Sequence, residues 1–413
     1  MKRFSQRLTP VVGLFFLLNL LGCATYQSKV QSAREALSRR DFDKALTELK
    51  PLAEKENDDQ LVYLLDYGVA LQVAGKLKES NEIFLKADRL AEMVDYQSVS
   101  RIAGSLALNE EMVQYKGDTF EKIFINAYLA MNFLEMGQLD DALVEARRIN
   151  EKYLKYRADE KKAFELNSFS KYLSAVIWEA SRNYDDAYIA YNEAYKIDPT
   201  ISTIHEDLIR SAKLARRMDT YQSWKKQFPE VKEQSSWYEK NLGELVVIYQ
   251  QGWGPRKVAS PNEYRFPTLM PTYSETQQAR VDIEQKSYLS REVYDVQKAA
   301  IETLRDDQGI LIAKRIGGIA TKAVLSDQVR QKNELLGSLT WIALNVADRA
   351  DVRQWSTLPQ TIQMIRIPLA AGKYKFNIEG LNSSGGYTTE SLENQEVEIK
   401  AGQKKFIVWR SLK

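Results

Sequence analysis

Large apolar residues in the N-terminal half recur every three or four positions, which is the spacing of one face of an α-helix. The clearest stretches are 61–90, 123–150 and 168–199. In each stretch, alanine, glycine or serine is set among the large apolar residues at the same helical spacing. Two helices pack closely only where such small side chains face each other. The pattern therefore predicts pairs of antiparallel helices stacked along the chain.

Four short strings mark the turn of each predicted pair. Each has a turn, one large apolar residue, a polar helix start and a small residue, and the small residues are Ala45, Ser80, Ala142 and Ala187. The first two lie 35 residues apart, the next two 62 and the last two 45. We therefore expect a degenerate segment near 91–117 and an insertion near 152–165 to interrupt the array.

These strings resemble the tetratricopeptide repeat (TPR), a helix-turn-helix unit of about 34 residues that stacks into a solenoid with a concave face. Leu64, Gly68 and Phe84 match its pattern in one unit, and Ala194 and the closing Pro199 match it in another. The resemblance implies a TPR-like helical domain over residues 23–230. The alternative is a generic α-helical bundle, and either fold is an interaction scaffold rather than a reaction centre.

The resemblance also assigns a concave groove to the first helix of each unit. Its predicted lining, a hypothetical partner-binding surface, is mostly apolar: Val62, Leu65, Val69, Phe124, Met131, Leu134, Phe169, Tyr172 and Val176. An exposed apolar groove of this size needs a cover. The two candidate occupants are a partner's helix or extended segment and the protein's own C-terminal half, which we favour. Any one of these residues could instead be ordinary core between paired helices.

The first 22 residues have the pattern of a signal peptide. Three basic residues precede the apolar run 11–21, which is too short to span a bilayer and ends just before Cys23. This resembles a bacterial lipoprotein signal, which implies cleavage before Cys23 and acylation of that residue. Several acyl chains at one residue make a stable membrane anchor. Since Ala24 follows the cysteine, we expect an outer-membrane address facing the periplasm; the alternative is an uncleaved anchor.

The amino-acid composition excludes several kinds of catalytic and binding site. The chain of 413 residues has one cysteine and one histidine, so it forms no internal disulfide and offers no thiol–histidine pair or His-rich zinc site. It has 58 basic and 56 acidic residues, but three of the basic ones lie in 1–22, which leaves 55 against 56. The mature chain is thus nearly neutral, and we expect no nucleic-acid binding. We also expect no cofactor and no metal.

After residue 230 the helical pattern gives way to mixed structure. The β-rich run 243–249 predicts a buried strand, and a connector with several prolines follows to about residue 290. Helical patterns are expected over 291–360, with separate helices at about 291–305, 309–328 and 333–347. Four strand-like runs over 361–413 predict an antiparallel sheet or sandwich. The expected fold class is therefore α+β, mainly α, with a TPR-like solenoid followed by a mixed C-terminal domain.

Three stretches carry a more specific resemblance, namely 115–128, 243–257 and 347–359. Together they resemble a family of repeat-containing bacterial envelope lipoproteins that has no settled activity. The resemblance supports the architecture and the envelope address, and it supplies no catalytic residues.

One segment of the C-terminal half combines charges with an indole. It contains Asp348, Arg349, Asp351, Arg353 and Trp355 and ends at a Leu-Pro pair. One hypothesis is a saccharide or peptide site, because aromatic faces beside charges bind sugars. The alternative, which we favour, is an Asp–Arg network that pins the last helix onto the sheet with Trp355 as a buried plug.

Two classes of function remain open. The first is a lipid-anchored, non-catalytic envelope scaffold that holds a protein partner. The second is a protein that binds or processes peptidoglycan or another polysaccharide, or that regulates cell-wall synthesis. Polymer hydrolysis would need two facing carboxylates in an open cleft. A groove filled by the protein's own chain would instead make the C-terminal domain the working surface.

Overall fold

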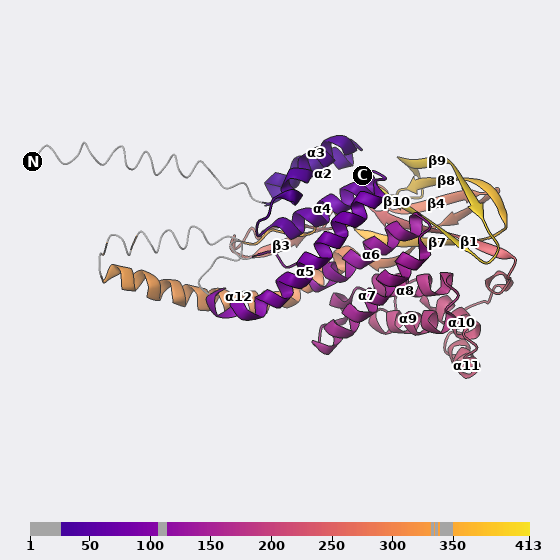
Figure 1. Cartoon of the computed structure of the whole chain (residues 1–413), viewed down its shortest axis with the longest axis horizontal. Helices are drawn as coiled ribbons and strands as arrows, with labels where there is room; N and C mark the ends of the chain where they lie inside the picture. The colour runs from indigo at the N-terminus through magenta and orange to yellow at the C-terminus, as the bar shows by residue number, and fades with distance from the viewer. Residues whose placement is uncertain (1–25, 106–113, 332–333, 335–337, 339–349) are drawn as a thin grey trace, which may run out of the picture.

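A computed structural model describes residues 26–105, 114–331, 334, 338 and 350–413 (Figure 1). Cys23, Asp348 and Arg349 lie outside the described residues. The described chain is an α+β fold in which paired helices are followed by strands and one long helix. The paired helices are α2 (Tyr26–Ser38), α3 (Phe42–Glu54), α4 (Gln60–Val73), α5 (Leu77–Ser105), α6 (Thr119–Glu135), α7 (Leu139–Ala158), α8 (Ser168–Ala180), α9 (Tyr184–Ile197), α10 (Ile204–Leu214) and α11 (Met218–Gln227).

The turn within each helix pair contains one residue in the left-handed backbone region. At Gly75 and Gly137 the φ angle is 75°, and at Arg40 and Arg182 it is 60° and 62°. A left-handed residue just after a helix ends it, and glycine adopts this conformation without strain. The α10–α11 pair has the same turn at Arg216, with φ of 58°. The structure thus adds a fifth helix pair to the four aligned from the sequence.

Close packing within a pair depends on the small residues. A Cβ on Gly68 would lie 2.8 Å from the ring of Phe84, so no larger residue fits there without movement. Ser80 is fully buried and donates a hydrogen bond to the Gly68 carbonyl at 2.8 Å. Where the structure describes them, the expected interruptions include extensions of helices, because α5 runs on to Ser105 and α7 to Ala158, before the 3-10 turn η2 (Ala163–Leu166). Residues 106–113 of the expected segment 91–117 lie outside the described residues.

Two four-stranded sheets form the second half of the fold. Sheet A has the order β10-β1-β7-β6, and sheet C has the order β5-β4-β8-β9. A third sheet is the two-stranded β2–β3 hairpin. The strands are β1 (Leu242–Gln251), β2 (Arg256–Ala259), β3 (Pro267–Met270), β4 (Gln278–Ile283), β5 (Lys286–Leu289), β6 (Arg291–Asp295), β7 (Thr361–Ala370), β8 (Gly372–Leu381), β9 (Tyr387–Ile399) and β10 (Lys404–Arg410), and the 3-10 turn η3 (Ser235–Trp237) precedes them.

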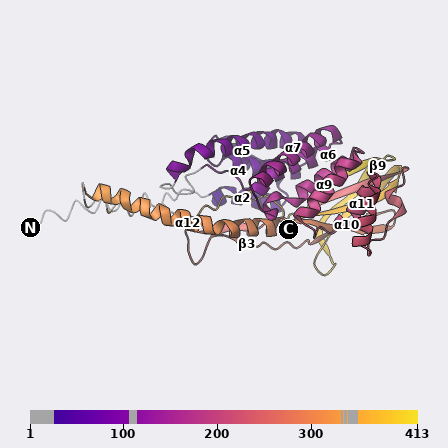
Figure 2. The same cartoon turned by 90° about the horizontal axis from the view of Figure 1, so that it is seen from below.

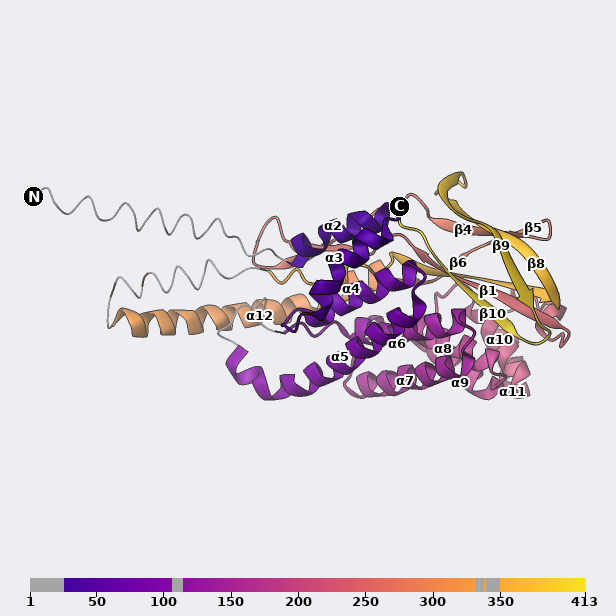
Figure 3. The ribbon, with the colours of Figure 1, turned by 45° about the horizontal axis from the view of Figure 1, so that its top comes forward.

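Helices, sheet A and sheet C make three layers. Alternate residues of β1 point in opposite directions, so Val246 and Ile248 join the core shared with the helices. Leu245 and Val247 join a second core between the two sheets. Both faces of β1 are therefore buried, which explains its continuous apolar run. Figure 3 shows the paired helices lying along one side of the sheets.

The structure corrects three sequence-based expectations for the C-terminal half. The tail is not wholly antiparallel, because β10 pairs with β1 in parallel, Val246 lying opposite Phe406. The region 291–360 begins with strand β6, and residues 351–360 contain no helix. Sheet A combines strands from all three segments expected after residue 230. Strand β1 comes from 231–290, β6 from 291–360, and β7 and β10 from 361–413, so the three segments form one unit.

Helix α12 (Val296–Arg330) is one continuous helix where two were expected. It starts beside the sheets and then projects beyond the rest of the molecule, on the same side as the β2–β3 hairpin (Figures 1 and 2). Among the described residues, none of the helices combines the length and apolar character that a membrane crossing requires.

Candidate functional site

The concave face of the helical repeats is filled by the protein's own C-terminal half. All nine predicted groove residues are at most 2% exposed. They belong to one core with residues of sheet A, among them Val246, Ile248 and Met364. Of the two occupants considered from the sequence, the structure places the C-terminal half in the groove. The nine side chains therefore have no surface left for a second protein.

Trp355 occupies the centre of this contact. It is 2% exposed, and its ring lies 5.2 Å from Tyr128, 5.9 Å from Phe84 and 6.2 Å from Phe124, measured between centroids. Its backbone N–H donates to Glu121 Oε1 at 3.0 Å, and its indole N–H donates to a threonine hydroxyl. Because aromatic rings cover the indole, Trp355 cannot serve as a platform for a sugar. The saccharide hypothesis for this residue is therefore wrong, and the indole is a buried plug.

The charges beside Trp355 also serve packing. Arg353 donates to Asp351 at 2.7–2.9 Å and to Asp59, between α3 and α4, at 3.0 Å. Burial lowers the pKa of the Arg353 guanidinium, but the two carboxylates outweigh it and raise that pKa above its usual value. The network links the segment after α12 to the solenoid at Asp59, whereas the sequence predicted a pin between the last helix and the sheet.

A second network of charges lies where α8 and α10 meet sheet A. Arg366 of β7 donates to Glu179 of α8 at 2.9 Å and to Glu244 of β1 at 2.7 Å. Arg210 of α10 donates to the other Glu179 oxygen at 2.9 Å, and Lys404 of β10 lies 3.0 Å from Glu179. We call this set, together with Asp207, the interface charge cluster. It holds three cations and three carboxylates, so its charges balance.

Two carboxylates of the cluster, Glu179 and Glu244, stay ionised in spite of burial. Burial raises the pKa of Glu179, but Arg210, Arg366 and Lys404 outweigh it and hold that pKa well below its usual value. Burial likewise raises the pKa of Glu244, whereas Arg366 and Lys404 lower it to about 2. Buried ion pairs persist only when each charge is compensated. The cluster therefore fixes the register between solenoid and sheet.

Two further polar clusters cross the same boundary. Gln72 of α4 accepts from Gln250 of β1 at 3.0 Å, and Gln250 in turn accepts from Arg410 of β10 at 3.2 Å. Asp66 of α4 accepts the hydroxyl of Tyr26 and the backbone N–H of Thr357 at 3.0 Å. Burial raises the pKa of Asp66 to about 6, although hydrogen bonds from the hydroxyls of Tyr26 and Thr357 lower it. Each cluster thus ties a helix of the solenoid to residues beyond 240.

Glu135, at the C-terminal end of α6, makes a testable contribution to pH-dependent stability. Burial raises its pKa to about 7, although a hydrogen bond from Val408 and the charge of Lys405 lower it. In the unfolded chain a glutamate titrates near 4.3. The folded state therefore binds more protons between these values, and its stability falls as pH rises through that window, remaining low above it.

We expect Glu135→Gln to remove this fall. The free energy of unfolding of the variant should equal that of the wild type near pH 4 and exceed it by about 1–3 kcal/mol near pH 8. The range allows for the partial exposure of the Glu135 side chain. Urea unfolding across this pH range measures the difference, and Glu54→Gln at the end of α3, where the side chain is 64% exposed, is the control. Parallel pH profiles for wild type and Glu135→Gln would contradict the assignment.

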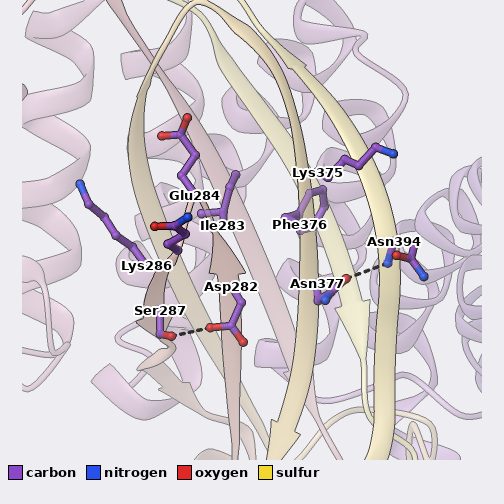
Figure 4. A pocket seen from close by; sticks show the side chains of 10 residues that line it. Asp282, Ile283, Glu284, Lys286, Ser287, Lys375, Phe376, Asn377 and Asn394 are labelled. Carbon is purple, nitrogen blue, oxygen red and sulfur yellow. Dashed lines mark hydrogen bonds between the residues drawn. The ribbon is translucent and has the colours of Figure 1, made fainter.

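An open hollow of about 380 Å³ lies at the end of sheet C, lined by the β4–β5 turn and by β8 and β9 (Figure 4). Its two carboxylates, Asp282 and Glu284, both come from the β4–β5 hairpin. Asp282 is paired with Arg280 at 2.9 Å and bonded to the Ser287 hydroxyl. The facing β8–β9 side supplies Lys375, amides and Phe376. The hollow therefore lacks the two facing carboxylates that glycoside hydrolysis requires.

The single histidine has a packing role. The ring of His205 stacks on Phe228 with centroids 3.7 Å apart and planes at 9°, and its Nδ1 lies 3.7 Å from Glu230. Within the described residues, no cluster of three or more histidine, cysteine, aspartate or glutamate side chains is arranged to hold a metal.

Arg366 and Gln250 were not picked out from the sequence, although the repeat alignment places their partners Glu179 and Gln72 on the concave face. Arg366 interrupts the apolar strand 361–370, and Gln250 ends the apolar run of β1. A single charge within a buried strand needs a buried counter-charge. That signal marks Arg366 as a contact residue, but it does not name Glu179 as its partner.

Comparison with known proteins gives partial matches among solved structures only. No family model matches, and no curated protein matches. Among solved structures, MamA of AMB-1 is 12% identical, with 49% of this chain and 89% of that chain covered and a TM-score of 0.31. MamA from Desulfovibrio magneticus RS-1 is 18% identical, with 48% and 89% covered and a TM-score of 0.31. The TPR-like character of the N-terminal half rests on its helix pairs and their left-handed turns.

Proposed function

We propose that this protein is a lipid-anchored, non-catalytic interaction scaffold of the cell envelope. In this account Cys23 is the acylated first residue of the mature chain, and the protein faces the periplasm from the outer membrane. The filled groove is the observation that carries the proposal. A solenoid whose concave face is occupied by its own sheet acts as a rigid support, so the partner surface lies on the C-terminal domain.

The solvent face of sheet C is the surface we propose for the partner. Leu289 is 50% exposed and lies opposite Arg280 in the β4–β5 pair, so both side chains are on one face. Tyr387 is 59% exposed, and the Arg280 guanidinium lies 5.0 Å from its ring centroid. Exposed aromatic and arginine side chains together are typical of protein interfaces. Binding or processing of peptidoglycan is the alternative, and the hollow of sheet C does not favour it.

Photo-cross-linking in cells tests this proposal. A benzoylphenylalanine placed at Leu289 or Tyr387 should give discrete protein adducts, and Cys23→Ala should abolish them by releasing the chain from the membrane. Ile189 on α9 is a matched control, since it is apolar and 41% exposed. Adducts from Ile189 alone would assign the partner to the solenoid surface, and adducts to sacculus fragments would favour the polymer alternative.

A further inference from the structure

The β2–β3 hairpin and the residues just after it expose an unusual amount of apolar surface. Tyr264 is 55% exposed, Met270 54% and Tyr273 80%. Among the side chains that the structure describes, these are three of the four most exposed large apolar ones. Apolar side chains gathered in this way are typical of an interaction surface.

The same segment carries a positive charge. Residues 256–273 contain Arg256, Lys257 and Arg265 but only one acidic residue, Glu263. Met270 lies opposite Arg256 in the hairpin, and the Arg265 guanidinium lies 5.5 Å from the ring centroid of Tyr264. Basic and apolar side chains thus alternate over one small surface, which suits an anionic and partly apolar partner.

The first described residues lie next to this hairpin. The side chain of Gln27, in the first turn of α2, donates to the Lys257 carbonyl at 3.3 Å and to the Val352 carbonyl at 3.0 Å. Three peptide units separate the Cα atoms of Cys23 and Tyr26, so covalent geometry limits the distance between these atoms to about 10 Å. A lipid on Cys23 would therefore hold the hairpin close to the membrane. Figures 1 and 3 show the hairpin and the start of α2 at the end from which α12 projects.

We propose that the β2–β3 hairpin, with Tyr264, Met270 and Tyr273, is a second membrane contact that binds anionic phospholipid beside the acylated cysteine. This inference rests on the proposed lipid anchor. Tyrosine is favoured at the interface between water and acyl chains. Lysine and arginine are attracted by anionic headgroups. The acyl chains supply attachment, and the hairpin sets how the body is oriented on the membrane.

A fluorescent probe on the acylated protein tests the contact. Cys23 is the only cysteine, and acylation blocks its thiol, so Met270→Cys provides one free thiol for an environment-sensitive dye. The protein is placed in vesicles of phosphatidylethanolamine and phosphatidylglycerol that contain spin-labelled lipid. We expect severalfold stronger quenching of this dye than of the same dye at Val144→Cys. Val144 is 43% exposed, and it belongs to α7, which lies on the far side of the molecule from β3 in Figure 2.

Three outcomes separate the explanations. Mass spectrometry of the purified chain first shows whether Cys23 carries lipid; an unmodified cysteine would overturn the proposed anchor and this inference with it. Equal quenching at Met270 and Val144 in acylated protein would overturn this inference alone. A change in dye emission that depends on the protein-to-lipid ratio, and not on the spin-labelled lipid, would show that the hairpin contacts a second copy of the chain. Arg256→Glu should reduce the quenching in the anionic vesicles only.

Discussion

Replacing Arg366 with methionine is expected to lower the free energy of unfolding by about 3–5 kcal/mol. The side chain of Arg366 is 12% exposed and contacts Glu179, Glu244 and Asp207, at distances of 2.7–3.2 Å. Methionine preserves much of the volume but leaves these carboxylates with too little positive charge. An uncompensated buried charge costs more than the lost hydrogen bonds alone.

Urea unfolding of the mature chain carrying Cys23→Ala measures the effect without the lipid. Arg39→Met is the matched control, because its side chain is 72% exposed and its ion pair with Glu35 is a surface pair at 3.6 Å. Such pairs contribute about 0–1 kcal/mol. If the two substitutions cost the same, the interface charge cluster would not be buried in solution.

Trp355→Ala is expected to destabilise the fold by about 3–5 kcal/mol, the usual cost of removing a buried large aromatic side chain. The indole fills the space between α5, α6 and sheet A, and the rings of Phe84 and Tyr128 would border the cavity left behind. The contact between solenoid and sheet should loosen together with the loss of stability.

Thermal unfolding and limited proteolysis of Trp355→Ala test this prediction. Trp355→Phe keeps part of the ring packing and should cost less, whereas Tyr387→Ala, at a 59% exposed site, should stay within about 0.5 kcal/mol of the wild type. A Trp355→Ala protein as stable as Tyr387→Ala would show that the indole is exposed in solution and would reopen the ligand-site hypothesis.

The helical half could be predicted from the sequence because its determinants are local. Gly75 and Gly137 mark turns by their conformational freedom, and small residues such as Ala142 mark close contacts at fixed spacing. The turns at Arg40, Arg182 and Arg216 give no such signal, because arginine has no preference for the left-handed backbone region that would mark it in a sequence. Alignment with the other strings identified two of these turns, and the third was missed.

The C-terminal half was predicted less well because its determinants are long-range. Strand β10 lies about 160 residues beyond β1, and the apolar pattern of a strand does not say which neighbour it pairs with, or in which direction. The pattern of 291–305 suggested a helix, but its first five residues form the edge strand β6. Tertiary pairing overrode local pattern there.

The site was predicted in part. The resemblance to the TPR assigned the groove residues, and the apolar character of these residues required a cover. What fills the groove depends on Arg366, Gln250 and Trp355, which lie far from the groove in the sequence. The favoured interpretation of Trp355 as a buried plug came from its position at a junction between elements. Its three aromatic neighbours could be found only in three dimensions.

A double-mutant cycle on Glu179 and Arg366 tests the central claim, that the C-terminal sheet fills the concave face of the solenoid. The cycle compares the unfolding free energies of the wild type, Glu179→Gln, Arg366→Met and the double variant. Because the two side chains are 2.9 Å apart across the boundary, we expect a coupling energy of about 2 kcal/mol or more. Effects that add to within about 0.5 kcal/mol would mean that the two halves do not contact in solution, and would contradict the account.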